Sequence, residues 1–369
     1  MPVEFLGMGG TNARSETDPL TGPVVDKEYT LRLARAHEDN GWDRVLFGYS
    51  SASPDGDQVA AYVAAHTERL QLLLAHRPGV TFPTHTARQL ATLDRFADGR
   101  LTVHIITGGN DTEQRREGDY FPKDERYART HEYIRILKRA LTSRERFSHE
   151  GRFYRFEDFV SEVFPVESVP ISFGGSSAAA YRVGAAEADV YCLWGEPLAG
   201  TAEQIATVKK AAEEAGRATP PRIQVAFRPI IAPTEKLAWE KAERTLERIT
   251  RRRPVPPGGD RPQNAGSQRL LKIAEQGERF DRALWTATAK ATGGAGNSNA
   301  LVGTPEQVAQ ALLDYVDLGV SIISMRGYDI LGDAIEVGRE VIPLVREEVA
   351  RRDRERARAA QEPPAKAAS

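Results

Sequence analysis

The sequence predicts an α/β protein built as a closed (β/α)8 TIM barrel with insertions. Three observations carry this prediction. Short β-branched apolar runs alternate with longer amphipathic stretches along most of the 369 residues. The apolar runs are brief and unbroken, which is typical of strands buried on both faces of a parallel sheet. Eight such runs fit within the usual length of one α/β barrel.

The predicted elements follow this alternation in order. The strand candidates are Val3–Gly7, Arg44–Phe47, Leu70–Ala75, Leu101–Ile106, Ile171–Gly174, Val190–Leu193, Ile223–Arg228 and Ser321–Arg326. The helix candidates are Lys27–Asn40, Asp57–His66, Thr84–Phe96, Asp124–Leu141, Ala178–Glu187, Ala202–Ala215, Thr234–Thr250, Pro305–Leu318 and Gly332–Glu348. Asn40-Gly41 and Asp98-Gly99 are helix stop signals. A doubly wound open sheet is the alternative, but no helix directly follows the glycines of residues 7–12, as its dinucleotide-binding turn requires.

We expect residues 1–350 to form one barrel domain with two insertions. Residues 148–162 have the pattern of a short hairpin, and residues 251–300 open with RRRPVPPGGDRPQ and close with TGGAGNSN. An irregular stretch of the second kind is either a functional lid or a tolerated surface insertion, and we expect a mobile lid. Residues 351–369 are charged and rich in Pro and Ala, which predicts a fraying helix and a disordered tail.

The composition excludes several classes of function. Fifty Lys and Arg against 52 Asp and Glu give a net charge of −2, which argues against a nucleic-acid-binding protein. No apolar run is long enough for a membrane span, and Met1–Phe5 lacks the pattern of a signal peptide. Cys192 is the single cysteine, so an intramolecular disulfide and a cysteine zinc cage are excluded. No residues have metal-ligand spacing, and we expect a cytoplasmic protein without a bound metal.

In a parallel barrel the site lies where the strands end. The segment Phe173-Gly174-Gly175-Ser176-Ser177 leads from the fifth strand directly into a helix. Two glycines allow close approach of the backbone, and hydroxyls at a helix N-terminus favour a phosphate. A plain tight turn with a serine N-cap explains the same residues. Thr107-Gly108-Gly109, after the fourth strand, leaves similar room for a flat ligand or forms an ordinary turn.

Other side chains at strand ends suggest a substrate site. Trp194 could wall a ring or fill the barrel rim, and Arg228 and Arg326 could form an anion clamp or pair with Glu196 or Asp329. His76, at the end of the third strand, is the best acid–base candidate among the histidines. The chain has no evident nucleophile triad, which indicates that a cofactor carries the chemistry.

Several motifs together resemble one family. They are HRPGVTFPT (76–84), ARQLATLDR (87–95), FGGSS (173–177), LWGEP (193–197), TGGAG (292–296) and RGY (326–328). In this order, along nearly the whole chain, they resemble the bacterial-luciferase-like flavin monooxygenases. The two-component alkanesulfonate monooxygenases are the most similar members.

The resemblance implies a TIM barrel that receives reduced FMN from a separate NAD(P)H-dependent flavin reductase and activates O2. It implies a small anionic organic substrate, a sulfonate, whose C–S bond is cleaved to give sulfite and an aldehyde. It also implies a homodimer or homotetramer. No membrane or nucleic-acid partner is expected.

The resemblance also implies roles for individual residues, which are taken from the matching positions of the family. The expected FMN ligands are Thr107, Gly108, Tyr127, Gly174, Gly175, Ser176 and Ser177, with the last three at the phosphate and the first two at the isoalloxazine ring. The expected catalytic residues are Arg228, Tyr328, Trp194 and Ser53. The expected substrate-binding residues are Trp194, Arg228, Arg326, His76 and Lys290.

This sequence departs from the family mainly on the substrate side. The family's His, Cys, His, lid Arg and His correspond here to Gly9, Ser53, Ile230, Thr292 and Ile330. Lys290 lies near the position of the lid Arg, and Arg326 replaces a small residue. Two alternatives therefore stay open: a deazaflavin (F420)-dependent oxidoreductase of the same superfamily, and a flavin-binding protein without catalytic activity.

Overall fold

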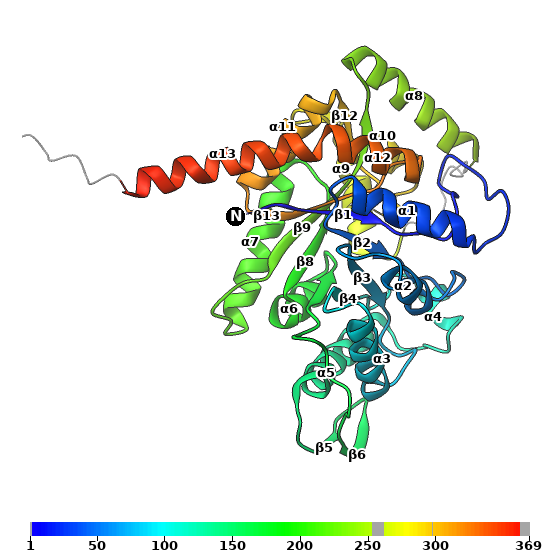
Figure 1. Cartoon of the computed structure of the whole chain (residues 1–369), viewed down its shortest axis with the longest axis vertical. Coiled ribbons are helices and arrows are strands. Elements are labelled where there is room, and N and C mark those ends of the chain that lie inside the picture. Colours follow the sequence, from blue (N-terminus) through cyan, green and yellow to red (C-terminus); the bar gives the residue numbers. More distant parts are fainter. Residues whose placement is uncertain (1, 253–261, 297, 362–369) are drawn as a thin grey trace, which may run out of the picture.

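A computed structural model describes residues 2–252, 262–296 and 298–361. Eight parallel strands form a closed barrel surrounded by helices (Figure 1). The barrel strands are β1 (Glu4–Met8), β2 (Arg44–Phe47), β3 (Gln71–His76), β4 (Leu101–Ile105), β7 (Ile171–Gly174), β8 (Val190–Trp194), β9 (Arg222–Ile231) and β13 (Val320–Met325). Each pairs in parallel with the next, and β13 pairs with β1, which closes the ring. The predicted (β/α)8 TIM barrel is confirmed, with all eight strands at the expected segments.

The helices lie outside this ring. The longer ones are α1 (Lys27–Asp39), α2 (Gly56–Ala64), α3 (Pro83–Phe96), α5 (Lys123–Thr142), α6 (Ala178–Glu187), α7 (Leu198–Glu214), α8 (Glu235–Arg252), α9 (Ala265–Gln276), α11 (Pro305–Asp317), α12 (Ile330–Glu340) and α13 (Ile342–Gln361). Two short helices are α4 (Asp111–Arg115) and α10 (Ala287–Ala291). The last predicted helix, Gly332–Glu348, is in fact two, because Pro343 lacks an N–H for a continuous helix. Helix α13 also runs as far as Gln361, into the segment expected to be disordered, whereas residues 362–369 lie outside the described residues.

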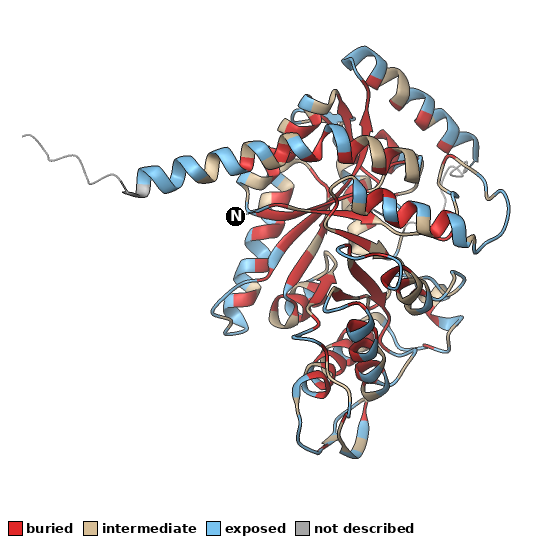
Figure 2. Cartoon of the chain, viewed as in Figure 1, coloured by how far each residue is buried: buried red, intermediate tan, exposed pale blue. Residues whose placement is uncertain are grey.

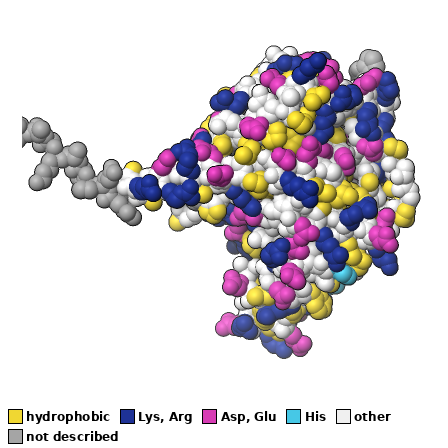
Figure 3. Space-filling model, turned by 45° about the horizontal axis from the view of Figure 1, so that its top comes forward, with side chains coloured by type: hydrophobic (Ala, Val, Ile, Leu, Met, Phe, Trp, Pro, Cys, Tyr) yellow, Lys and Arg dark blue, Asp and Glu magenta, His cyan; other side chains and the backbone are white. Residues whose placement is uncertain are grey.

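Side chains of the strands alternate between the barrel interior and the helix layer. Leu6, Leu73, Val190 and Ile322 pack together inside the ring. The outward residues join a larger apolar core with the helices. Figure 2 shows buried residues along the strands and exposed residues on the outer faces of the helices. On the face in Figure 3, acidic and basic side chains are interspersed. Within the described residues, no helix is both long and apolar enough to cross a bilayer.

The two insertions have structure of their own. The first contains the antiparallel strands β5 (Phe147–Glu150) and β6 (Arg155–Phe159). The second contains α9, α10 and the short strands β10 (Arg279–Phe280) and β11 (Leu284–Trp285). Its end leads into β12 (Ala300–Gly303), which pairs in parallel with the last four residues of β9. The sequence predicts a strand that ends at Arg228, but β9 continues to Ile231.

Candidate functional site

Buried polar atoms lie at the carboxyl ends of the strands. Among the described residues, buried side-chain atoms without a hydrogen-bond partner include Gln114 Oε1, Ser298 Oγ, Asn299 Oδ1 and Arg326 Nε. Most buried polar groups in proteins are satisfied, so atoms of this kind mark the places where a ligand or strain is expected. Catalytic sites of TIM barrels lie at this same end.

The turn between β7 and α6 requires a glycine because its backbone lies close to the first turn of α6. Gly175 has a φ of 142°, and a Cβ atom there would lie 2.7 Å from Cβ of Ala180. The Ser177 hydroxyl caps α6 by accepting a hydrogen bond from Ala180 N at 3.2 Å. Burial raises the pKa of Tyr127, and a hydrogen bond with Ser177 partly offsets this. The structure therefore brings together three of the predicted FMN ligands, Gly175, Ser177 and Tyr127, at a helix N-terminus suited to an anion.

Ser176, in the same turn, is hydrogen-bonded to Gln204, a residue that the sequence analysis did not single out. Ser176 Oγ donates to Gln204 Oε1 of α7 at 3.1 Å, and the Tyr181 hydroxyl donates to the same oxygen at 2.9 Å. Gln204 thus fixes the Ser176 hydroxyl next to the start of α6. No local sequence pattern links residues 176 and 204.

The loop after β4 has small residues for a steric reason. Gly108 has a φ of 94°, and a Cβ atom there would lie 2.3 Å from Cδ of Gln114. Thr107 is buried and donates from Oγ1 to Thr130 Oγ1 of α5 at 3.2 Å. Because its proton is used in this bond, the Thr107 hydroxyl is left only as an acceptor for a ligand.

Helix α9 of the second insertion covers Trp194. A Cβ atom on Gly266 would lie 2.7 Å from Cζ3 of Trp194, so the helix backbone lies directly on the indole. Arg269 of α9 makes two hydrogen bonds of 2.8 Å to the buried carboxylate of Glu196, which follows β8. On the other side of the mouth, Asp111 N donates to Gln263 Oε1 at 2.9 Å. The start of this insertion thus spans the mouth from β4 to β8.

Arg228 and Arg326 share one carboxylate. Arg228 Nη2 lies 2.8 Å from Glu16 Oε1, and Arg326 Nη2 lies 2.5 Å from Glu16 Oε2. Burial alone would raise the pKa of Glu16, but the two guanidiniums lower it to about 2. The alternative of an ion pair is therefore correct for both arginines, although the partner is neither Glu196 nor Asp329. Glu16 lies in the β1–α1 loop (residues 9–26) and belongs to no motif, so no sequence pattern pointed to its role.

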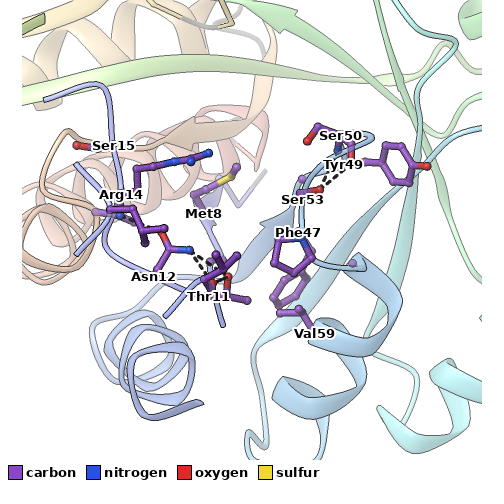
Figure 4. Close-up of a pocket in the computed structure, with 18 of the residues that line it drawn as sticks. Met8, Thr11, Asn12, Arg14, Ser15, Phe47, Tyr49, Ser50, Ser53 and Val59 are labelled. Atoms are coloured by element: carbon purple, nitrogen blue, oxygen red, sulfur yellow. Dashed lines mark hydrogen bonds between the residues drawn. The ribbon is translucent and has the colours of Figure 1, made fainter. Parts of the chain in front are cut away.

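A cavity of about 790 Å³ opens beside this ion pair, at the ends of β1 and β2. Figure 4 shows Thr11, Asn12 and Arg14 of the β1–α1 loop on one side and Phe47, Ser50 and Ser53 on the other. Of the described residues that line it, the charged ones are Arg14, Glu16, Arg252 and Arg326. The predicted residue Ser53 is here, with Oγ donating to Ser50 O at 2.9 Å.

Three predicted residues lie elsewhere. His76 is the last residue of β3 and faces the helix layer, where Nε2 lies 2.7 Å from the Tyr133 hydroxyl of α5. Burial lowers the pKa of His76 to about 4. Lys290 is exposed on α10, outside the described lining of the cavity. Tyr328 is buried under Arg228, whose Cζ is 5.4 Å from the ring centroid, and burial raises its pKa.

The barrel interior holds a polar cluster below the mouth. His104 Nδ1 is 2.9 Å from Ser172 Oγ, which is 3.0 Å from Cys192 Sγ. Burial lowers the pKa of His104 to about 4 and raises that of Cys192 to about 12. Both groups are therefore neutral near pH 7. No group of three His, Cys, Asp or Glu suited to a metal occurs in the described part of the chain.

Comparisons with known proteins agree with the barrel fold. Solved structures of similar fold include a riboflavin lyase, RcaE, with 19% identity over 95% of this chain and 92% of that chain and a TM-score of 0.78. They include the EDTA monooxygenase EmoA from Chelativorans sp. BNC1, with 16% identity over 95% of each chain and a TM-score of 0.75. An F420-dependent secondary alcohol dehydrogenase has 14% identity over 94% of this chain and 100% of that chain, with a TM-score of 0.70. At these identities the likeness is one of fold. The family model described as luciferase-like monooxygenase matches residues 8–321, and the chain belongs to this family.

Proposed function

We propose that this protein is the oxygenase of a two-component system, which receives reduced FMN from a separate NAD(P)H-dependent flavin reductase and oxidises a small sulfonated organic substrate. The observation that carries the proposal is the cavity at the barrel mouth, whose described charged lining is three arginines and one glutamate. Arginine suits the planar recognition of oxyanions.

The residues near β4 and β7 fit the proposed FMN. Gly175 leaves no space for a Cβ atom, while Ser176, Ser177 and Tyr127 supply hydroxyl groups beside a helix N-terminus. These residues and Gly174 would hold the phosphate. The loop with Gly108 would lie along the ring, beside the partnerless Gln114 Oε1. Bound reduced FMN would supply the two electrons that the reduction of O2 requires.

In the proposed reaction the substrate loses its sulfonate group and is oxidised to an aldehyde. One oxygen atom of O2 is added at the carbon of the C–S bond, the other leaves as water, and the sulfonate departs as bisulfite while the carbon becomes an aldehyde. Arg326 would bind the sulfonate, and Met8 and Phe47 would contact the organic part. Helix α9 over Trp194 would exclude water from the reacting centre.

Tyr328, which lies next to Arg228 behind the described lining of the cavity, is the proposed proton donor. Its raised pKa keeps the hydroxyl protonated near pH 7, and Arg228 holds the ring in place. Replacing Tyr328 with Phe should lower kcat by roughly 10²-fold or more with a small change in KM. Unchanged kinetics would remove this role.

The test of the proposed function is direct. Reduced FMN, O2 and a panel of sulfonates are mixed with the protein, and sulfite and aldehyde are assayed. Formation of both with at least one sulfonate is the expected result. FMN binding without sulfite from any member would overturn C–S cleavage.

A deazaflavin-dependent dehydrogenase is the second candidate, since an F420-dependent enzyme shares the fold over 94% of this chain. The β7–α6 turn could hold the phosphate of either coenzyme. Parallel titrations with reduced FMN and F420 separate the two, because tight F420 binding with hydride transfer from an alcohol would favour the second.

A further inference from the structure

We propose that Glu16 sets the charge that the cavity accepts, so that the site binds a substrate group with one negative charge and rejects a doubly charged group of the same shape. The inference deepens the proposed function and rests on the cavity being its substrate site. It concerns Glu16, Arg228 and Arg326, which meet although they lie far apart in the sequence.

Arg326 and Arg228 play different parts in this ion pair. Arg326 lines the cavity, and its Nε is buried without a hydrogen-bond partner among the described residues. Arg228 is 3% exposed and lies behind the cavity lining. Besides Glu16, its Nη1 donates to the carbonyls of Arg326 at 3.4 Å and Gly327 at 3.5 Å. Arg228 thus positions Glu16 and the strand end, and Arg326 is the guanidinium that faces a ligand.

The charges of the three groups sum to a single positive charge. A singly charged anion on Arg326 would therefore neutralise the set. A doubly charged anion would leave an excess negative charge next to the Glu16 carboxylate, in a place where screening is weak. Arg14 and Arg252 also line the cavity, but both are exposed and their charges are screened by solvent.

The β1–α1 loop holds Glu16 in position. Thr11 Oγ1 and Asn12 Nδ2 both donate to Val24 O at 2.7 Å, which ties the two ends of the loop. Asp18 of the same loop pairs with Arg248 of α8 at 2.5 Å. Because the loop is fastened on both sides of Glu16, the carboxylate is a fixed part of the site.

Glu16 and Arg326 keep their charges over the pH range of the test, whereas Asp57 changes its charge within it. Glu16 has a pKa of about 2 and Arg326 one of about 10, where burial is the main cause of the lowering. From α1 and the β13–α12 connection, Tyr29, Tyr328 and Asp329 face this region, and burial raises the pKa of both tyrosines. On α2, which contributes Gly56 and Val59 to the cavity, burial raises the pKa of Asp57 to about 6.

The experiment compares n-butyl sulfate with n-butyl phosphate, which share a tetrahedral head on an ester oxygen. The sulfate keeps one negative charge, whereas the phosphate passes from one to two around a pKa of about 6. Dissociation constants are measured by calorimetry at about pH 5 and about pH 8, and of the two ligands only the phosphate ester changes its charge between these values. Saturating FMN keeps the phosphate ester out of the β7–α6 turn. The charge of Asp57 also differs between the two pH values and acts more strongly on the doubly charged ester, so Glu16→Gln, which keeps Asp57, isolates the effect of Glu16.

In the wild-type protein we expect the phosphate ester to bind at least about tenfold more weakly than the sulfate at the higher pH and about equally at the lower pH. Glu16→Gln should remove the tenfold discrimination. Glu28→Gln, which removes an exposed carboxylate in the first turn of α1, outside the β1–α1 loop, should keep it.

Equal binding of both esters by the wild type at the higher pH would overturn the proposal, as would a ratio unchanged by Glu16→Gln. Equal tightening of both esters in Glu16→Gln would also overturn it, because Glu16 would then compete with the anion. If Glu16→Gln does not fold, the pH series of Asp57→Asn decides, because loss of the discrimination there would assign it to Asp57 and overturn the proposal. Failure of FMN or of both esters to bind would instead overturn the proposed function.

Discussion

The two halves of the barrel mouth are built by different means. Where β4, β7 and β8 end, the features are local and depend on the backbone, as in the β7–α6 turn with Gly175 and the Ser177 cap. Where β1, β2, β9 and β13 end, one carboxylate joins two guanidiniums that are 212 and 310 residues away in the sequence. The first half suits a constant ligand such as a coenzyme phosphate. The second can be changed by single charged substitutions, which suits a substrate.

Removing Arg228 should have the largest effect, and it should be confined to the second half. Arg228→Ala leaves Glu16 short of a partner in a buried place, so the free energy of unfolding should fall by about 3–5 kcal/mol in urea titrations. FMN binding should stay unchanged while substrate saturation is lost. Arg222→Ala, at the other end of β9 and 45% exposed at its side chain, is the control and should cost below about 1 kcal/mol. Loss of FMN binding with Arg228→Ala would place this residue on the coenzyme.

A methyl group at Gly175 should break the first half. Gly175→Ala introduces a contact of 2.7 Å with Ala180 and strains a φ of 142°. The FMN dissociation constant should rise about 10- to 100-fold, measured by fluorescence titration. Gly216→Ala is the control, since this glycine also has a positive φ of 74° but open space around it. If both variants bind FMN like the wild type, the coenzyme does not use this turn.

The ion pair between Arg269 of α9 and Glu196 should hold α9 over Trp194. Arg269→Met leaves the Glu196 carboxylate, which is 2% exposed, without its bidentate partner. Amide hydrogen exchange in α9 should become at least about tenfold faster. Arg282→Met removes a surface pair with Asp314 from the same insertion and should leave exchange in α9 as it was. Equal rates in all three proteins would show that the ion pair does not hold the cover.

Acid should weaken the surroundings of the buried histidines and the Glu16 ion pair in different pH ranges. Burial lowers the pKa of His76 and His104 from 6.5 to about 4, so the unfolded chain binds more protons between these values and stability falls as pH drops from 6.5 towards 4. The contribution of Glu16, whose pKa is lowered from 4.5 to about 2, is lost only between these lower values. In urea titrations across pH, His104→Asn should flatten the upper range and Glu16→Gln the lower one. Flattening in the same range would contradict this separation.

The sequence was sufficient for features that depend on neighbouring residues. The eight strands and the β7–α6 turn follow from apolar periodicity and from glycine and serine chemistry over a few positions. The Glu16 pair could not be predicted in this way, because it depends on the closure of the barrel. His76 was assigned to the mouth because the strand prediction ended at Ala75. The strand in fact includes His76, and alternation then turns its side chain toward α5.

A crystal structure with FMN and an alkanesulfonate tests the central claim most directly. The account predicts the FMN phosphate on residues 174–177 and the sulfonate in the cavity against Arg326, with Glu16 still bridging Arg228 and Arg326. A phosphate bound elsewhere, or a sulfonate that leaves the Arg326 side of the cavity empty, would contradict it.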